Sequence, residues 1–128
     1  MSRIMLALKT LTAEQAPVSA AAQRTLVFDE VDAGIGGSAA VAVGRSLASL
    51  GERHQVLVVT HLAQVAALAT TQIVVSKQVV DGVTIAEARS VDGDQRVDEI
   101  ARMLSGDAGG ASARQHAAEL LSKSARSR

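Results

Sequence analysis

Two short apolar runs, each followed by polar side chains, constrain the fold of this chain most. Thr25–Phe28 leads directly into the carboxylates of Asp29 and Glu30, and Gln55–Thr60 leads into His61. A short apolar run bounded by charge or glycine is typical of a buried central strand in an α/β sheet. The carboxyl ends of parallel strands meet at one edge of the sheet, where ligands of open α/β sheets bind. We therefore expect Asp29, Glu30 and His61 to lie at one such edge.

Adjacent acids at that edge can do two kinds of chemistry. One carboxylate can hold a hard cation such as Mg²⁺, and the next can orient or deprotonate a nucleophilic water. Alternatively, the pair could cap the following helix, since acids favour helix N-termini, although that helix is expected to begin only at Ser38. His61 could likewise be an ordinary core or surface histidine. From the residues alone, these alternatives stay open.

The order of the elements predicts an α/β fold with a mostly parallel sheet, flanking helices and a β-hairpin towards the C-terminus. The Asp81-Gly82 pair is a strong hairpin signal between residues 77–80 and 83–88. A third parallel strand is expected at Gln72–Ser76. Helices are expected at residues 2–15, 38–50, 62–69, 97–104 and 112–121. Residues 1–122 would form one domain and residues 123–128 a disordered tail.

Composition excludes several classes of function. The chain has 13 basic and 13 acidic residues, so no overall positive field attracts DNA. Aromatic residues make up 1%, which leaves no platform for stacking bases. The chain has no cysteine, so disulfides and thiolate metal sites are excluded. No apolar run is long enough to span a bilayer, and we expect a cytoplasmic protein without a membrane partner.

A dinucleotide-binding fingerprint is the main rival interpretation of the glycines. Gly34-x-Gly36-x-x-Ala39 fits the spacing, follows a strand and opens a helix. Three nearby acids, Asp29, Glu30 and Asp32, would however crowd a pyrophosphate with like charge. The acid expected to bind the ribose after the next strand is also missing. The pattern does not favour an oxidoreductase.

Three motifs together resemble a known family. Leu26–Gly37, Val58–Ala66 and Arg96–Leu104, in this order, look like the C-terminal part of the RecN family of bacterial DNA repair proteins. That family is similar to the SMC-type ATPases of the ABC superfamily, and the resemblance runs from Ser2 to about Leu121. It implies that residues 1–122 are the C-terminal lobe of an ABC/SMC-like P-loop NTPase head.

The resemblance also implies roles for single residues. Asp29 matches the Walker B aspartate, which helps to hold Mg²⁺, and Glu30 matches the catalytic glutamate, which polarises the attacking water. His61 matches the switch histidine, which contacts the γ-phosphate of ATP. The D-loop region, which crosses the interface between two heads and would contribute to cofactor binding, includes Asp32, Gly34, Gly36 and Gly37.

Some motifs of an intact head are missing from the chain. No Gly-x-x-x-x-Gly-Lys-Ser/Thr phosphate loop occurs, and the family's signature motif would end just before Ser2. We therefore expect ATP and Mg²⁺ to bind only with an N-terminal lobe or a second ATPase head as partner, and the isolated chain to be inactive. The resemblance implies recombinational repair of DNA double-strand breaks, with DNA contacted only through the intact protein. The alternative is a truncated, non-catalytic interaction module that pairs with another head.

Overall fold

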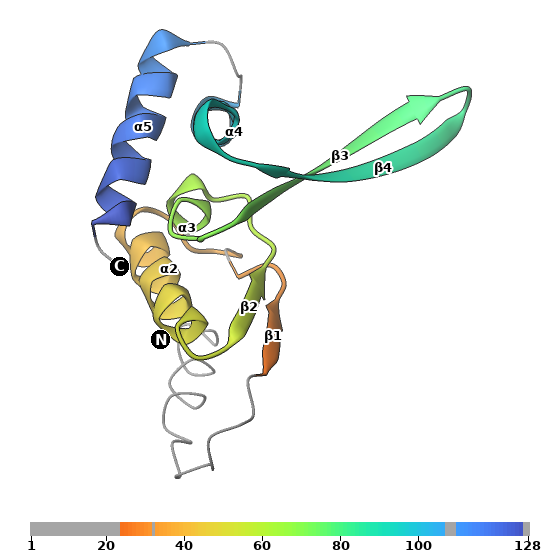
Figure 1. Ribbon diagram of the computed structural model, residues 1–128. Coiled ribbons are helices and arrows are strands. Elements are labelled where there is room, and N and C mark those ends of the chain that lie inside the picture. The colour runs from red at the N-terminus through yellow and green to blue at the C-terminus, as the bar shows by residue number, and fades with distance from the viewer. Residues whose placement is uncertain (1–23, 32, 107–109, 127–128) are drawn as a thin grey trace. The chain divides into compact units, whose positions relative to one another are not determined.

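The computed structural model describes residues 24–31, 33–106 and 110–126. The chain divides into two compact units, one ending at Leu68 and the other beginning at Ala69, and Figure 1 shows the elements of each. The helix predicted at residues 2–15 lies outside the described residues. In the part of the chain that the structure describes, no helix is both long and apolar enough to cross a membrane.

The first unit is a β-α-β arrangement followed by one short helix. It contains strand β1 (Thr25–Phe28), helix α2 (Gly37–Gly51), strand β2 (Gln55–Val58) and helix α3 (Ala63–Ala66). The two strands pair in parallel, from Thr25 opposite Gln55 to Phe28 opposite Val58. Parallel strands need a crossover connection, and α2 lies within it.

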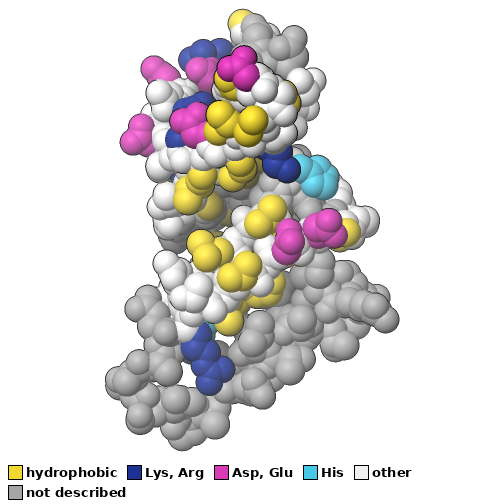
Figure 2. Space-filling model, turned by 90° about the vertical axis from the view of Figure 1, so that its right-hand side faces the viewer, with side chains coloured by type: hydrophobic (Ala, Val, Ile, Leu, Met, Phe, Trp, Pro, Cys, Tyr) yellow, Lys and Arg dark blue, Asp and Glu magenta, His cyan; other side chains and the backbone are white. Residues whose placement is uncertain are grey.

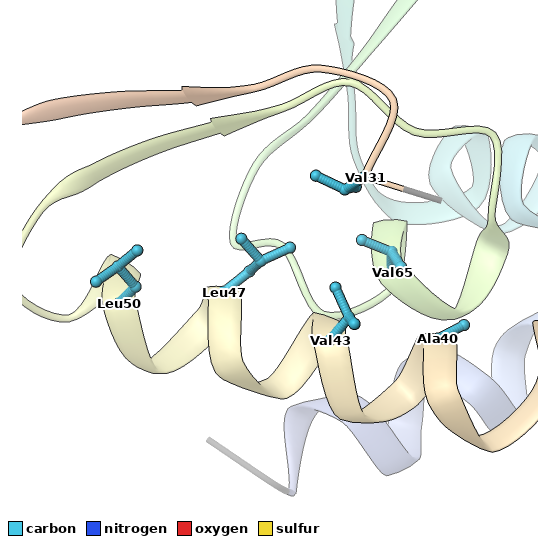
Figure 3. Packing of buried hydrophobic residues seen from close by; sticks show 6 residues of the cluster. All are labelled: Val31, Ala40, Val43, Leu47, Leu50 and Val65. Carbon is cyan, nitrogen blue, oxygen red and sulfur yellow. The ribbon is translucent and has the colours of Figure 1, made fainter. Parts of the chain in front are cut away.

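The core of the first unit lies between the strand pair and α2. Alternate strand residues (Leu26, Phe28, Val56 and Val58) pack against a buried cluster formed mainly by α2. Figure 3 shows this cluster, which consists of Val31, Ala40, Val43, Leu47, Leu50 and Val65. The four α2 members follow helical spacing, so they share one face of the helix. Full burial of each larger apolar side chain stabilises the unit by roughly 1.5–3 kcal/mol.

The second unit joins a long hairpin to two helices. Strands β3 (Gln72–Val80) and β4 (Val83–Val91) are antiparallel, and helices α4 (Gly93–Ser105) and α5 (Ala111–Ala125) follow. Asp81 and Gly82 have φ values of 50° and 78°, as a two-residue type I′ turn requires. The predicted hairpin is therefore confirmed. Ile100 and Ala101 of α4 and Ala117 of α5 are fully buried.

Two expectations about the elements are corrected by the structure. Residues 72–76 do not form a third parallel strand. They begin β3, and among the described residues β3 pairs only with β4, with Gln72 opposite Val91. Each sheet thus has two strands in the part of the chain that the structure describes. Residues 72–76 pair with residues 87–91, because the Asp-Gly turn sets a continuous antiparallel register that includes them.

The C-terminal helix is also longer than predicted. It ends at Ala125, so residues 123–125 are helical rather than part of a frayed tail. Ser124 is buried and its Oγ donates a hydrogen bond of 2.9 Å to the Leu120 carbonyl, which ties this last turn to the helix. The Arg126 side chain donates to Ser122 Oγ at 3.0 Å, which adds a second contact at the end.

Candidate functional site

The candidate site lies where β1 and β2 end. The Val59 N–H donates a 2.8 Å hydrogen bond to the Phe28 carbonyl, one step beyond the last paired residues of the ladder. Both strands therefore end at the same level. The exposed side chains of Asp29, Glu30 and His61 follow immediately, so the structure brings all three residues to one edge of the parallel pair.

A strained turn holds the acidic pair. Glu30 has a φ of 53°, in the left-handed region that costs a residue with a side chain roughly 1–2 kcal/mol. The next residue, Val31, is 2% exposed and belongs to the buried cluster, and the Ala33 N–H donates to the Glu30 carbonyl at 3.2 Å. Burial of Val31 offsets the backbone strain and directs Glu30 to solvent. Such outliers cluster at functional sites. Asp32 lies outside the described residues.

A hydroxyl shapes the turn at the end of β2. Thr60 Oγ1 accepts a hydrogen bond of 3.0 Å from the Leu62 N–H and so defines the backbone on both sides of His61. Leu62 and Val65 then pack against the core of the unit. Sequence reasoning missed Thr60, although a threonine hydroxyl that accepts from the N–H two residues later is a known turn pattern. Helix α3, at Ala63–Ala66, is shorter than predicted.

The glycines predicted for the cofactor-binding loop lie in the open stretch that leads into α2, whose first residue is Gly37. Gly34 and Gly37 have φ values of 76° and 55°, which other residues rarely adopt, whereas Gly36 is extended. A Cβ at any of the three would meet nothing within 4 Å. The first turn of α2 has no acidic residue, and no side chain caps it. The loop therefore leaves room for another backbone or a ligand to approach closely.

The acidic side chains at this edge can accept hydrogen bonds but, when ionised, cannot donate them. Among the described residues, Asp29 and Glu30 have neither a hydrogen bond nor an ion pair through their carboxylates. The arginines that adjoin the strands, Arg24 and Arg53, precede β1 and β2 and so lie at the opposite edge. Apart from His61, no titratable cation of the described first unit adjoins the acidic pair in sequence or along the strands.

The two carboxylates fit an open magnesium site better than a closed metal cage. In residues 24–31, 33–106 and 110–126, no group of three or more His, Cys, Asp or Glu side chains could hold a metal ion. Mg²⁺ commonly binds through one or two carboxylates and keeps waters or substrate phosphates as its other ligands. Asp29 could supply one such oxygen ligand at an exposed position, with Glu30 next to it in the chain.

Comparison with known proteins identifies relatives along the whole chain. No family model matches it. Relatives include proteins of Deinococcus radiodurans (52% identical over 121 residues, 94% of this chain), Mycobacterium leprae (51% over 121 residues, 94%) and Treponema pallidum (45% over 128 residues, 100%). Their names place the relatives of this α/β chain among bacterial DNA repair proteins.

All three relatives bear the same name, DNA repair protein RecN. At these identities the chain is homologous to RecN and matches a C-terminal part of it, so the predicted resemblance is confirmed. The chain covers 20%, 19% and 22% of the lengths of these relatives, about a fifth of each.

Proposed function

We propose that the chain is the C-terminal lobe of a RecN-like, ABC/SMC-type ATPase head that acts in recombinational repair of DNA double-strand breaks. One observation carries the proposal: the in-register parallel pairing of β1 and β2 brings Asp29, Glu30 and His61 to one edge. It does so in a chain that is homologous to RecN. A cytoplasmic location, and contact with DNA only through the intact protein, follow from this role.

In the proposed mechanism each polar side chain has a separate task. Asp29 would hold Mg²⁺, which supplies charge neutralisation at the phosphates when it is bound. The Glu30 carboxylate accepts a hydrogen bond from the attacking water and orients it. His61 donates a hydrogen bond to the terminal phosphate of ATP, and the turn that Thr60 holds sets its position.

The glycine loop would form the contact with a second head. Gly34, Gly36 and Gly37 leave their backbone open, since a Cβ at each would meet no atom within 4 Å. A partner backbone could therefore approach their N–H and C=O groups without a steric barrier. Asp32, in the same loop, is proposed to take part in this contact.

The phosphate donors must come from another lobe. The sequence has no phosphate loop, and a charge-assisted hydrogen bond to a phosphate contributes roughly 1.5–3 kcal/mol. A partner lobe would restore several such bonds. The isolated chain should therefore neither bind ATP tightly nor hydrolyse it.

Reconstituted ATP hydrolysis tests the proposal. The chain would be co-expressed with the part of D. radiodurans RecN outside its match, and Mg²⁺-dependent phosphate release would be measured. Glu30→Gln should lower the rate by about 10²–10⁴-fold, the usual contribution of a general base. Glu52→Gln, an exposed residue at the C-terminal end of α2, is the matched control and should leave the rate within twofold of wild type. Equal rates for wild type and Glu30→Gln would refute the assignment.

A second candidate function is a non-catalytic module that pairs with another head and modulates it. Exposed apolar side chains on the strand pair favour it, since Val27 and Val59 are 66% and 60% exposed on the face away from α2. Parallel strands are normally covered on both faces. A complex that forms and hydrolyses ATP equally well with Glu30→Gln would support this second function.

A further inference from the structure

Strand β4 of the second unit has an edge that no other strand covers. Among the described residues β3 and β4 form a sheet of their own, and Figure 1 shows no third strand beside either. Every residue of β4 except Val91 is exposed. An edge strand presents a row of peptide N–H and C=O groups with which another strand can pair. A two-stranded ribbon is at best marginally stable in water, and three or more strands make a stable sheet. The hairpin is therefore suited to the addition of further strands.

The turn determines which peptide groups of β4 point away from β3. Val80 lies opposite Val83, directly on either side of the two-residue turn. Such a flanking pair exchanges both of its hydrogen bonds, and hydrogen-bonded pairs alternate with non-hydrogen-bonded pairs along an antiparallel ladder. The peptide groups of Val83 and of every second residue after it therefore face β3. The peptide groups that face outwards belong to Thr84, Ala86, Ala88 and Ser90.

The side chains of β4 complement those of a second, antiparallel copy of the same strand. Ile85, Glu87, Arg89 and Val91 are alternate residues and so share one face. If Ala88 lies on a two-fold axis, Glu87 of each copy lies opposite Arg89 of the other. The same register places Ile85 of each copy opposite Val91 of the other. Two ion pairs in the middle of the strand and one apolar pair at each end would then form together.

This charge pattern favours one register and one edge. Cross-strand pairs of opposite charge stabilise a sheet, and like charges directly opposite each other destabilise it. Moving the axis from Ala88 to Glu87 would place two acids opposite each other, and moving it to Arg89 would do so for two arginines. The edge of β3 has no such complementarity, because Lys77 is its only charged residue.

The two charged side chains are available for such pairs. Among the described residues neither Glu87 nor Arg89 has an ion-pair partner, and the Arg89 guanidinium donates only to Gln95 Oε1, at 3.5 Å. Figure 2 views the molecule from the side towards which the hairpin points in Figure 1. It shows acidic, basic and hydrophobic side chains close together at this surface.

We propose that two copies of the chain pair through the outer edges of β4, antiparallel and with Ala88 on the two-fold axis, to form a continuous four-stranded sheet. Ile85 is 51% exposed in the single chain, whereas Val91 is 4% exposed. The pairing would therefore bring Ile85 of one copy to the apolar base of the other hairpin. The contact involves neither nucleotide nor the acids of the candidate site, so it does not rest on the proposed function.

Sedimentation of the chain without nucleotide or Mg²⁺ tests the pairing. Wild type should form a dimer at high concentration that dissociates on dilution. Glu87→Arg would place arginines opposite each other at both pairs, and Arg89→Glu would do the same with glutamates. Each variant alone should raise the dissociation constant at least about tenfold. Lys77→Glu makes the same charge change as Arg89→Glu on the other strand and should leave the constant within about threefold of wild type.

A mixture of the two single variants tests the register itself. In a heterodimer of Glu87→Arg and Arg89→Glu chains, both arginines of one chain lie opposite both glutamates of the other. The mixture should therefore form a dimer although neither variant does so alone at the same concentration. The double variant, which exchanges the two charges within one chain, should dimerise as wild type does. Dimer formation should also slow hydrogen exchange at the outward amides of residues 84, 86, 88 and 90.

Several outcomes would overturn the pairing. One is a wild-type chain that stays monomeric at every concentration, and another is a dimer that the single variants leave unchanged or that Lys77→Glu weakens equally. Single variants that break the dimer without rescue in the mixture or the double variant would show that the two charges do not face each other. Far-UV circular dichroism of each variant would show whether the hairpin is kept. Hydrolysis measured with Glu30→Gln bears on the catalytic proposal alone and leaves this result standing.

Discussion

A methyl group added at Gly44 should destabilise the first unit, although alanine is the better helix former. Gly44 lies in the middle of α2 and is buried. A Cβ there would lie 2.6 Å from Leu68 Cδ1, 3.4 Å from the Val65 Cα and 3.5 Å from the Gln64 carbonyl oxygen. Glycine is therefore needed for close approach of α2 to the α3 segment.

The structure gives the size of the effect. The Leu68 contact is about 1 Å shorter than an optimal carbon–carbon distance, so the end of the leucine must move. Leu68 is 7% exposed, and overpacking a filled site costs about 1–3 kcal/mol. Replacing glycine in a helix contributes about 1 kcal/mol in the opposite direction. Gly44→Ala should thus lower the free energy of unfolding by about 1 kcal/mol, which corresponds to a fall in Tm of about 2–8 °C.

Urea unfolding followed by far-UV circular dichroism measures this change, because the chain has no Trp or Tyr for fluorescence. Gly51→Ala is the control: it ends α2, and a Cβ there meets nothing within 4 Å, so stability should stay equal or rise. Leu68→Ala alone should cost about 2–5 kcal/mol. In the double variant of Gly44→Ala and Leu68→Ala, the new methyl group partly fills the cavity that the leucine leaves. The loss of unfolding free energy in the double variant should therefore be at least about 0.5 kcal/mol smaller than the sum of the two single losses. A Gly44→Ala protein as stable as Gly51→Ala would refute the packing argument.

Three further changes test the second unit. Ile100→Ala removes a fully buried side chain and should lower the unfolding free energy by about 2–5 kcal/mol in the same urea titration. Gly82→Ala places a side chain at φ 78° and should cost about 1–2 kcal/mol by backbone strain alone, since no atom lies within 4 Å of the new Cβ; an unchanged midpoint would contradict the turn geometry. Arg96→Lys keeps the charge but cannot reproduce the fork between Ala69 and Gln72, so hydrogen exchange should become faster at the base of β3.

Local signals in the sequence predicted much of the fold. The Asp81-Gly82 pair specified the hairpin because two consecutive residues with positive φ favour aspartate and glycine. The helix expected at residues 97–104 is present as part of α4, and Gly106 is its left-handed C-cap, with φ of 76°. The apolar run before Asp29 indicated a strand, and β1 is found there. In each case the deciding interactions lie within a few residues of the signal.

Other features depend on contacts that local patterns do not encode. Residues 72–76 are apolar enough for a buried parallel strand, and only pairing with residues 87–91 across the hairpin decides otherwise. The positive φ of Glu30 also had no signal, because the strain is held by burial of its neighbour Val31 in a core that includes α2 and α3. The candidate edge could be predicted from strand order, whereas the turn that presents Glu30 could not.

The charges at the candidate edge bear on why two lobes would be needed. Ionised Asp29 and Glu30 can only accept hydrogen bonds, and at about 4 Å they would repel a phosphate oxygen by about 1 kcal/mol per charge pair even in bulk water. The arginines next to β1 and β2 lie at the other end of the strands. ATP can bind favourably next to these carboxylates only under two conditions. A cation must lie between the carboxylates and the phosphates, and other groups must donate hydrogen bonds to the remaining phosphate oxygens. On this charge argument, the proposed activity would need a composite site. This chain would contribute the metal-binding and water-orienting acids, and a partner would contribute the phosphate donors.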